Sequence, residues 1–275
     1  MIVPSRDGTP VSVHDLGGTG RALLVSHATG FHGQCYLPLA QRLPNWHSVA
    51  LDYRGHGDTP HPAEPVDWMR YGDDAEAVAQ WLSEREGGPI DAFGHSMGGA
   101  CLLMAAHRRP DLFGRIVVFE PIVFPPAARD GGDNPLARGA LRRRATFASF
   151  DEALANFRAK PPLGRFHPDA LEAYVRHGFA EGRDGKVHLK CSREIESATF
   201  ATGAAHDTWD YLPTIHTEVV VVSGRLEPMQ PSSVAAPIAE RLANCRFVQR
   251  HDFDHFAPMT HPAEMAELIS ELLDG

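Results

Sequence analysis

The clearest chemical signal in the sequence is a serine between glycines, in the segment GHSMG at residues 94–98. Residues 90–95 (IDAFGH) are apolar enough for a short strand, and residues 96–109 (SMGGACLLMAAHRR) have the character of a helix. Ser96 therefore lies in a strand-to-helix turn of the pattern G-x-S-x-G, which exposes the serine oxygen. Glycine is favoured on both sides because a side chain there would collide with the adjoining strand or helix. A serine that only caps the helix is the structural alternative, but the paired glycines favour a nucleophile.

A serine hydroxyl becomes a useful nucleophile only when a neighbouring base takes its proton. The chain has 16 histidines, so position must select one of them. His255 lies in the segment HDFDHFAPMTHP, between the last predicted strand and the last predicted helix. Loops at the carboxyl ends of strands carry the sites of open parallel sheets. His255 is therefore predicted to be the base.

A carboxylate is needed to fix the tautomer of that histidine and to stabilise its charged form. Glu227, in the segment VVVVSGRLEPM, follows the next-to-last predicted strand by a short loop. Glu120, in RIVVFEPIVFPP, ends the strand that follows the nucleophile helix. The chain order serine, acid, histidine is satisfied by either residue, so both remain candidates.

Backbone N–H groups must face the oxygen on which negative charge develops during acyl transfer. One is expected from Met97, directly after the serine, and the second from Thr29, with Gly30 as the alternative, in the early loop SHATGFHG. His27 and His32 in the same loop have a spacing that suggests a metal site, but no third ligand is near in sequence. Neither a metal nor an organic cofactor is therefore predicted.

Large apolar side chains that flank the predicted catalytic loops are candidates for the wall of a substrate pocket. Such pockets are mostly apolar with a few polar groups. Besides Met97, the candidates are Phe31, Phe124, Trp209 and Met229. Their size favours an acyl or alcohol group larger than acetate.

Short apolar segments alternate with longer amphipathic ones, as expected for a parallel sheet covered by helices. The predicted strands lie at residues 10–16, 22–27, 47–53, 90–95, 115–120, 217–224 and 245–250. The predicted helices lie at residues 35–43, 68–86, 96–109, 231–243 and 262–275. The strands show little two-residue alternation, which indicates that both faces of the sheet are buried.

This alternation is interrupted between Pro121 and about Pro213. A segment rich in proline and glycine is followed by predicted helices at 136–147, 151–159, 168–180 and 192–200 and a predicted short strand at 186–190. We interpret residues 121–213 as a mainly helical lid inserted into a core made of residues 1–120 and 214–275.

Together these motifs resemble the α/β-hydrolase family over nearly the full chain. SHATGFHG is similar to its oxyanion loop, DYRGHGDT to a turn of the pattern D-x-R-G-x-G-x-S, and GHSMGG to its nucleophile turn. GRLEP is similar to its acid loop and DHFAPMTHP to its histidine loop. The resemblance implies a mostly parallel eight-stranded sheet flanked by helices, with the lid inserted after the sixth strand.

The sequence also departs from the family pattern. Ala28 stands where the oxyanion loop usually has glycine, and Glu227 stands where the acid is usually aspartate. FEPIVFP resembles the haloalkane dehalogenase branch, whose acid ends the earlier strand, but the nucleophile of that branch is aspartate and not serine. The resemblance favours Glu227 as the acid and leaves Glu120 as the alternative.

Charge and composition exclude several classes of protein. The net charge of −9 argues against binding to nucleic acid or to an anionic membrane. No apolar segment of about 18 residues is present, and the first residues lack the features of a signal peptide, so a cytoplasmic location is expected. The excess of arginine over lysine, with abundant alanine, glycine and proline, is typical of bacteria with GC-rich genomes. The four cysteines are widely spaced and indicate no disulfide framework or zinc site.

These features predict a serine hydrolase that cleaves a small carboxylic ester, thioester or lactone through an acyl-enzyme. The same residues would also serve a carbon–carbon bond hydrolase or a perhydrolase. A receptor-like protein that binds a ligand with little turnover is a third possibility, which a turnover below about one per hour would favour. The expected partner is a small acyl substrate, and the protein is expected to be a monomer or a homodimer.

Overall fold

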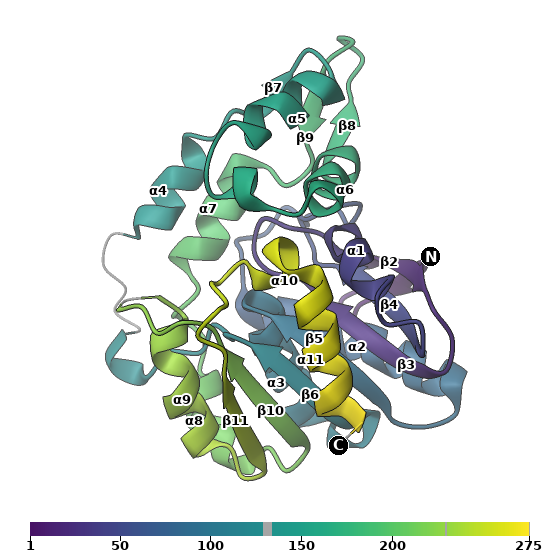
Figure 1. Ribbon diagram of the computed structural model, residues 1–275, viewed down its shortest axis with the longest axis vertical. Coiled ribbons are helices and arrows are strands. Elements are labelled where there is room, and N and C mark those ends of the chain that lie inside the picture. Colours follow the sequence, from purple (N-terminus) through teal and green to yellow (C-terminus); the bar gives the residue numbers. More distant parts are fainter. Residues whose placement is uncertain (129–133, 229, 275) are drawn as a thin grey trace.

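The computed structural model describes residues 1–128, 134–228 and 230–274. Its main sheet has eight strands in the order β1-β2-β4-β3-β5-β6-β10-β11 (Figure 1). β1 and β2 pair antiparallel, as do β2 and β4, and the remaining pairs are parallel. The predicted, mostly parallel eight-stranded sheet is therefore confirmed. The strands are β1 Ile2–Pro4, β2 Pro10–Gly17, β3 Arg21–Ser26, β4 Trp46–Asp52, β5 Ile90–His95, β6 Phe113–Phe119, β10 Glu218–Ser223 and β11 Cys245–Gln249.

Helices cover both faces of this sheet, which explains why its central strands are continuously apolar. Buried residues of α2, α3 and α9 form one core with the sheet, and those of α1 and α11 form a second core on its other face. In Figure 1, α11 lies in front of the strands and α2 and α3 lie behind them. No helix in the described ranges is long and apolar enough to cross a membrane. The bounds are α1 Leu37–Ala40, α2 Trp68–Glu86, α3 Met97–Arg108, α9 Ser232–Arg241, α10 Ala257–Thr260 and α11 Pro262–Asp274.

The segment between β6 and β10, residues 120–217, is called the insertion below. Its residues 134–201 stand above the ends of the central strands at the top of Figure 1, in teal and green, whereas α8 lies lower in the view and packs against α3. Besides helices it contains a three-stranded antiparallel sheet in the order β7-β9-β8. The elements are α4 Pro135–Leu141, β7 Thr146–Phe147, α5 Phe150–Arg158, α6 Pro168–Gly178, β8 Phe179–Glu181, β9 Val187–Leu189, α7 Arg193–Ala201 and α8 Thr208–Tyr211.

One predicted helix of the insertion is wrong in its second half. The helix expected at 136–147 ends at Leu141, because Thr146 pairs with His188 and Phe147 with Val187 in the small sheet. The predicted strand at 186–190 and the predicted helix at 192–200 are present as β9 and α7. Sheet pairing between distant segments decided the structure of Thr146 and Phe147, and the local sequence carries no sign of their partner.

Candidate active site

Ser96 occupies a strained turn between β5 and α3. Its backbone angles are φ 56° and ψ −115°, outside the regions that residues with a side chain ordinarily adopt. A Cβ at Gly98 would collide with the carbonyl oxygen of Ser26, and one at Gly94 would lie 2.7 Å from the Cα of Gly99. The two glycines therefore allow the close approach of strand and helix that the sequence pattern predicts.

A second strained residue ends the neighbouring strand. Among the described residues, Ser96 and Glu120 are the two non-glycine residues with positive φ, and φ of Glu120 is 47°. Backbone strain of this kind persists only where the surroundings hold it, and it clusters at functional sites. The N–H of Ser96 donates to the carbonyl of Phe119 at 2.9 Å, and the N–H of Glu120 donates to that of Val222 at 2.9 Å. These bonds hold both residues at the carboxyl ends of adjacent parallel strands.

His255 lies between the side chains of these two strained residues. Its Nε2 is 3.2 Å from Oγ of Ser96, and its Nδ1 is 2.5 Å from Oε2 of Glu120. Because an ionised carboxylate only accepts hydrogen bonds, the proton of a neutral His255 lies on Nδ1. The lone pair of Nε2 then faces the Ser96 hydroxyl, which is the arrangement that proton removal from a serine requires.

The structure contradicts the preference for Glu227 as the partner of His255. The side chain of Glu227 is 45% exposed, and its Oε1 accepts from Nη2 of Arg225 at 2.7 Å. The Glu120 side chain is 1% exposed, and its second carboxylate oxygen accepts from the Gly224 N–H at 2.8 Å. Glu120, the alternative, is thus the carboxylate in contact with the histidine.

The loop after β10 explains why Glu227 does not contact His255. Its first residue, Gly224, donates its N–H to Glu120, and the next, Arg225, donates its N–H to the carbonyl of Phe253 at 2.7 Å. These two hydrogen bonds fix the start of the loop against Glu120 and against the loop that carries His255. Glu227, further along, lies at the surface. A glutamate at the end of the apolar segment RIVVF was the available sequence signal, because a carboxylate in such a place is buried only when it is partnered.

Three backbone N–H groups beside Ser96 have no acceptor among the described residues: those of Met97, Thr29 and Gly30. Met97 is the first residue of α3, where the helix itself offers no acceptor. Ser26, at the end of β3, pairs with Gly94 of β5, so the loop that follows β3 lies next to the serine turn. The structure therefore brings both predicted groups of N–H donors to the same strand ends as Ser96.

A chain of hydrogen bonds connects this loop to the histidine loop. The Ala28 N–H donates to Oη of Tyr36 at 3.1 Å, and the Tyr36 hydroxyl donates to Nδ1 of His95 at 2.8 Å. Nε2 of His95 donates to the backbone carbonyl of His255 at 2.8 Å. Burial keeps the pKa of His95 well below its ordinary value, so the ring is neutral and one nitrogen can accept. Ala28 has no positive φ, so the missing family glycine is accommodated and its N–H is used by Tyr36.

The predicted pocket residues have different outcomes. The Phe31 ring lies 6.4 Å from the His95 ring, and it packs against Phe166 and Tyr174 of the insertion at 6.0 and 5.6 Å. Phe124 is half-buried, and Met229 lies outside the described residues. The Trp209 ring contacts Arg241 of α9 at 4.9 Å and belongs to the core on the other face of the sheet from Phe31. The aromatic neighbours of Phe31 were missed because they come from the insertion, far away in sequence.

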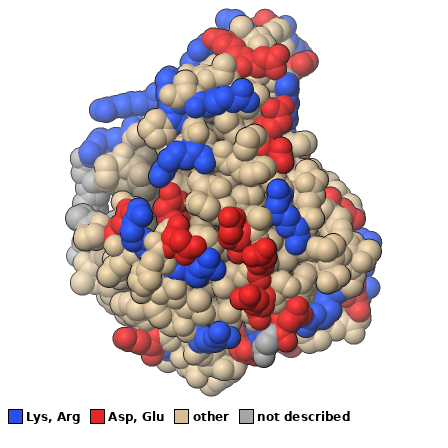
Figure 2. Space-filling view, in the orientation of Figure 1, with Lys and Arg blue, Asp and Glu red and all other residues tan. Residues whose placement is uncertain are grey.

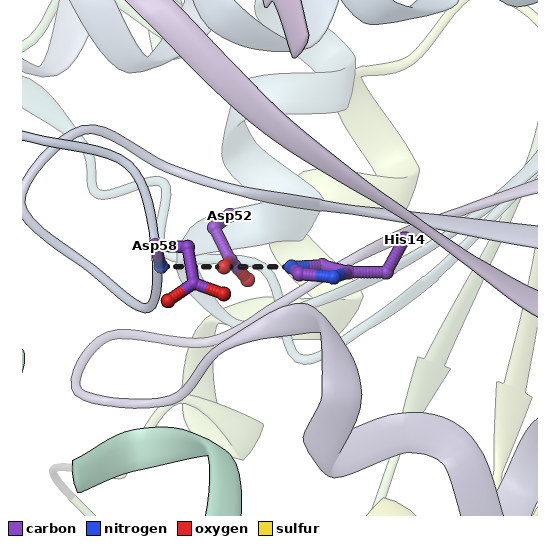
Figure 3. A group of neighbouring side chains, drawn as sticks. All are labelled: His14, Asp52 and Asp58. Atoms are coloured by element: carbon purple, nitrogen blue, oxygen red, sulfur yellow. Dashed lines mark hydrogen bonds and ion pairs between the residues drawn. The ribbon is translucent and has the colours of Figure 1, made fainter. Parts of the chain in front are cut away.

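One group of side chains has the composition of a metal site, His14, Asp52 and Asp58 (Figure 3). Figure 3 shows the His14 ring directed at Asp52, and their Nε2 and Oδ2 atoms are 2.8 Å apart. Asp52 also accepts the N–H groups of Gly33 and Asp58, and Asp58 pairs with Lys190 at 2.6 Å. Because protein groups already occupy these oxygens, we assign the cluster to bracing the turn DYRGHGDT against the loop that carries Thr29.

Several histidines behind the site are kept neutral by burial. Burial lowers the pKa of His27 to about 3 and those of His32 and His56 to about 4, and it also lowers the pKa of His95. Nε2 of His27, for example, accepts the Tyr53 N–H at 3.0 Å, which a protonated ring cannot do. These rings bind a proton in the unfolded chain more readily than in the folded one.

We therefore expect the protein to lose stability in mild acid. Below the ordinary histidine pKa of about 6.5 the unfolded chain takes up protons that the folded chain refuses, so the free energy of unfolding falls as pH falls. The loss is roughly 1 kcal/mol for each of His27, His32 and His56 between pH 7 and pH 5.5, and the lowered pKa of His95 acts in the same direction. Urea unfolding at half-unit pH intervals measures it. A free energy of unfolding that is constant over this range would contradict the assignment.

Comparisons with known proteins agree on one family. The model of the alpha/beta hydrolase family matches residues 22–268. The chain is 27% identical over 264 residues to lipase LipV of Mycobacterium tuberculosis, a match that covers 95% of this chain and 97% of that protein. It is 29% identical over 259 residues to the 2-(acetamidomethylene)succinate hydrolase of Mesorhizobium japonicum, covering 94% of this chain and 90% of that protein. The solved structure of the peroxisomal alpha-beta-hydrolase Lpx1 of Saccharomyces cerevisiae matches with a TM-score of 0.81 at 16% identity, covering 97% of this chain and 81% of that one.

Proposed function

The chain belongs to the alpha/beta hydrolase family, and from this premise we propose that it is a serine hydrolase of carboxylic esters, thioesters or lactones. One observation carries the proposal: the continuous contact from Oγ of Ser96 through His255 to the buried carboxylate of Glu120. Relatives named as a lipase and as methyl ester esterases support the same class of reaction. The choice of ester over other acyl compounds rests on these relatives.

In the proposed reaction Ser96 attacks the substrate carbonyl while Nε2 of His255 takes the hydroxyl proton. Glu120 holds the ring in the tautomer with the proton on Nδ1 and stabilises the charged ring that forms. The N–H groups of Met97 and Thr29 donate to the developing oxyanion. His255 then returns the proton to the leaving alcohol, and an acyl-enzyme remains. Water activated by the same histidine attacks the acyl group and releases the acid and free Ser96.

We also propose that residues 121–213 act as a lid. The part of the insertion from α4 to α7 stands above the central strands in Figure 1, and Ser96 and Glu120 directly follow two of these strands, β5 and β6. Its Phe166 lies between Phe31 and Phe256 at ring distances of 6.0 and 5.7 Å, so it forms an aromatic wall beside His255. Such a wall excludes water and packs against an apolar part of the substrate.

Turnover of a series of p-nitrophenyl esters, from acetate to decanoate, tests the proposed function. A kcat within the ordinary range of about 1 to 10³ s⁻¹ for at least one ester is the expected result. Turnover below about one per hour on every ester, with a ligand still bound, would support the receptor-like alternative instead. Activity confined to a diketone, or to a carboxylic acid with peroxide, would support carbon–carbon hydrolysis or perhydrolysis by the same residues.

A further inference from the structure

Three polar side chains of the insertion meet beside the predicted oxyanion loop. Arg143 follows α4, Tyr174 lies on α6 and Glu196 lies on α7. Nη1 of Arg143 contacts Oε2 of Glu196, and its Nη2 contacts the hydroxyl of Tyr174. We call these three residues the Arg143 cluster. α4 and α7 pack against each other, which brings the arginine and the glutamate together.

Contacts with the loop after β3 place the cluster next to the site. A Cβ built on Gly30 would lie 2.5 Å from Oε1 of Glu196, so this carboxylate touches the residue that follows Thr29. The Tyr174 ring lies 5.6 Å from the ring of Phe31, the next residue along the loop. The cluster therefore adjoins the loop whose backbone is proposed to hold the oxyanion.

Burying the charges of the Arg143 cluster costs free energy, which is not expected if the insertion only covers an apolar part of a substrate. The Glu196 side chain is 8% exposed and that of Arg143 is 21% exposed. Burying an ion pair removes the hydration of both groups, and hydrocarbon side chains of similar volume often give equal or greater stability. Figure 2 shows a hollow where α4 and α7 overhang the core, with Lys and Arg side chains gathered on the insertion above it. A role in binding explains why a charged pair is placed here.

Arg143 keeps hydrogen-bonding capacity that the protein does not use. Its contacts engage Nη1 and Nη2, and no described residue accepts from its Nε. The edge formed by Nε and Nη2 is the one that binds a carboxylate with two parallel hydrogen bonds.

We propose that Arg143 binds a carboxylate of the substrate, so that this protein prefers esters that also carry a free carboxylate, such as half-esters of short dicarboxylic acids. This inference rests on the proposed ester hydrolysis and names its substrate class. Glu196 holds the guanidinium in place through Nη1 and leaves the Nε edge for the substrate. The Tyr174 hydroxyl lies at the same guanidinium and adds a donor. The anionic end of the ester is then bound beside the loop while its carbonyl faces Ser96.

The test compares three pairs of methyl esters. Monomethyl succinate, glutarate and adipate are each paired with methyl butyrate, valerate or hexanoate, so that a carboxylate replaces a methyl group. For at least one pair, wild-type kcat/KM is expected to favour the anionic ester. Arg143→Gln should lower the ratio of anionic to neutral kcat/KM by about 10- to 100-fold, because a charge-assisted hydrogen bond is lost. Arg143→Lys should fall between, since it keeps the charge and loses the planar fork.

Arg142→Gln is the matched control, because it removes the same charge from an exposed neighbour, and it should leave the ratio unchanged. A wild type that favours the neutral ester in every pair would overturn the proposal, and so would an Arg143→Gln ratio equal to that of wild type. If melting shows that Arg143→Gln does not fold, Tyr174→Phe replaces it. That variant should lower the ratio by about 3- to 10-fold.

Direct binding separates this proposal from the proposed reaction. Calorimetry with glutarate on Ser96→Ala measures carboxylate binding without turnover, and adding Arg143→Gln should weaken that binding by at least about 10-fold. Glutarate binding that depends on Arg143, in a protein that hydrolyses no ester, would support the site and contradict the reaction. Equal glutarate affinity with and without Arg143, in a protein that does hydrolyse neutral esters, would contradict the carboxylate site alone.

Discussion

Ser96→Ala is expected to lower kcat for ester hydrolysis by about 10⁴-fold or more, because it removes the atom that attacks the carbonyl. The remaining rate would come from the oxyanion donors and from substrate binding. Alanine keeps a Cβ at the strained φ of 56°, so the substitution neither relieves nor adds backbone strain, and the melting temperature should change little. Rates on the fastest ester of the p-nitrophenyl series and thermal melting measure both effects.

A covalent label identifies the nucleophile independently of the substrate. After incubation with a fluorophosphonate, wild type is expected to gain the mass of one adduct, and Ser96→Ala none. Ser270→Ala is the matched control, since Ser270 lies on α11 and bonds to Asp274 at 3.2 Å, and this variant should label like wild type. An adduct on folded Ser96→Ala, or ester turnover that survives the substitution, would mean that another residue is the nucleophile.

The sequence predicted those parts of the site that are carried by short motifs. Ser96 is recognisable because its strained turn demands glycines at fixed spacing, and those glycines leave a local pattern. His255 follows from its place after the last strand, because the topology of a parallel sheet brings such loops together. The placement of Ser96 and of His255 depends on the order of strands and helices along the chain, and the pattern of apolar residues predicts that order.

The acid and the substrate-binding side depend on contacts that no local pattern encodes. Glu227 and Glu120 both follow strands whose ends meet near His255, and the bonds of Gly224 and Arg225 decide which carboxylate faces inward. The Arg143 cluster joins residues 31 and 53 positions apart in the chain. The packing of the insertion decides which residues meet in the Arg143 cluster. The same packing overrides a local preference for helix at Thr146, which pairs with His188 in the small sheet.

The two glutamates give the sharpest comparison within the proposed triad. Glu120→Gln is expected to lower kcat by about 10³- to 10⁴-fold. The amide keeps an oxygen for the Gly224 N–H but presents its NH₂ group to Nδ1 of His255, which must then accept. The ring proton moves to Nε2, and that nitrogen can no longer take the proton of Ser96. The negative charge that stabilises the protonated ring is lost as well.

Glu227→Gln is the matched variant, because it makes the same chemical change on the loop after β10. Its side chain is 45% exposed and pairs with Arg225 at the surface, and exposed pairs contribute little to stability. Its kcat is therefore expected to stay within about two-fold of wild type.

Steady-state rates on one neutral ester, with the rate of fluorophosphonate labelling as a second readout, compare the two variants. A large loss in Glu227→Gln beside a small one in Glu120→Gln would show that the loop after β10 supplies the acid during turnover. Equal small losses would show that His255 acts without an orienting carboxylate.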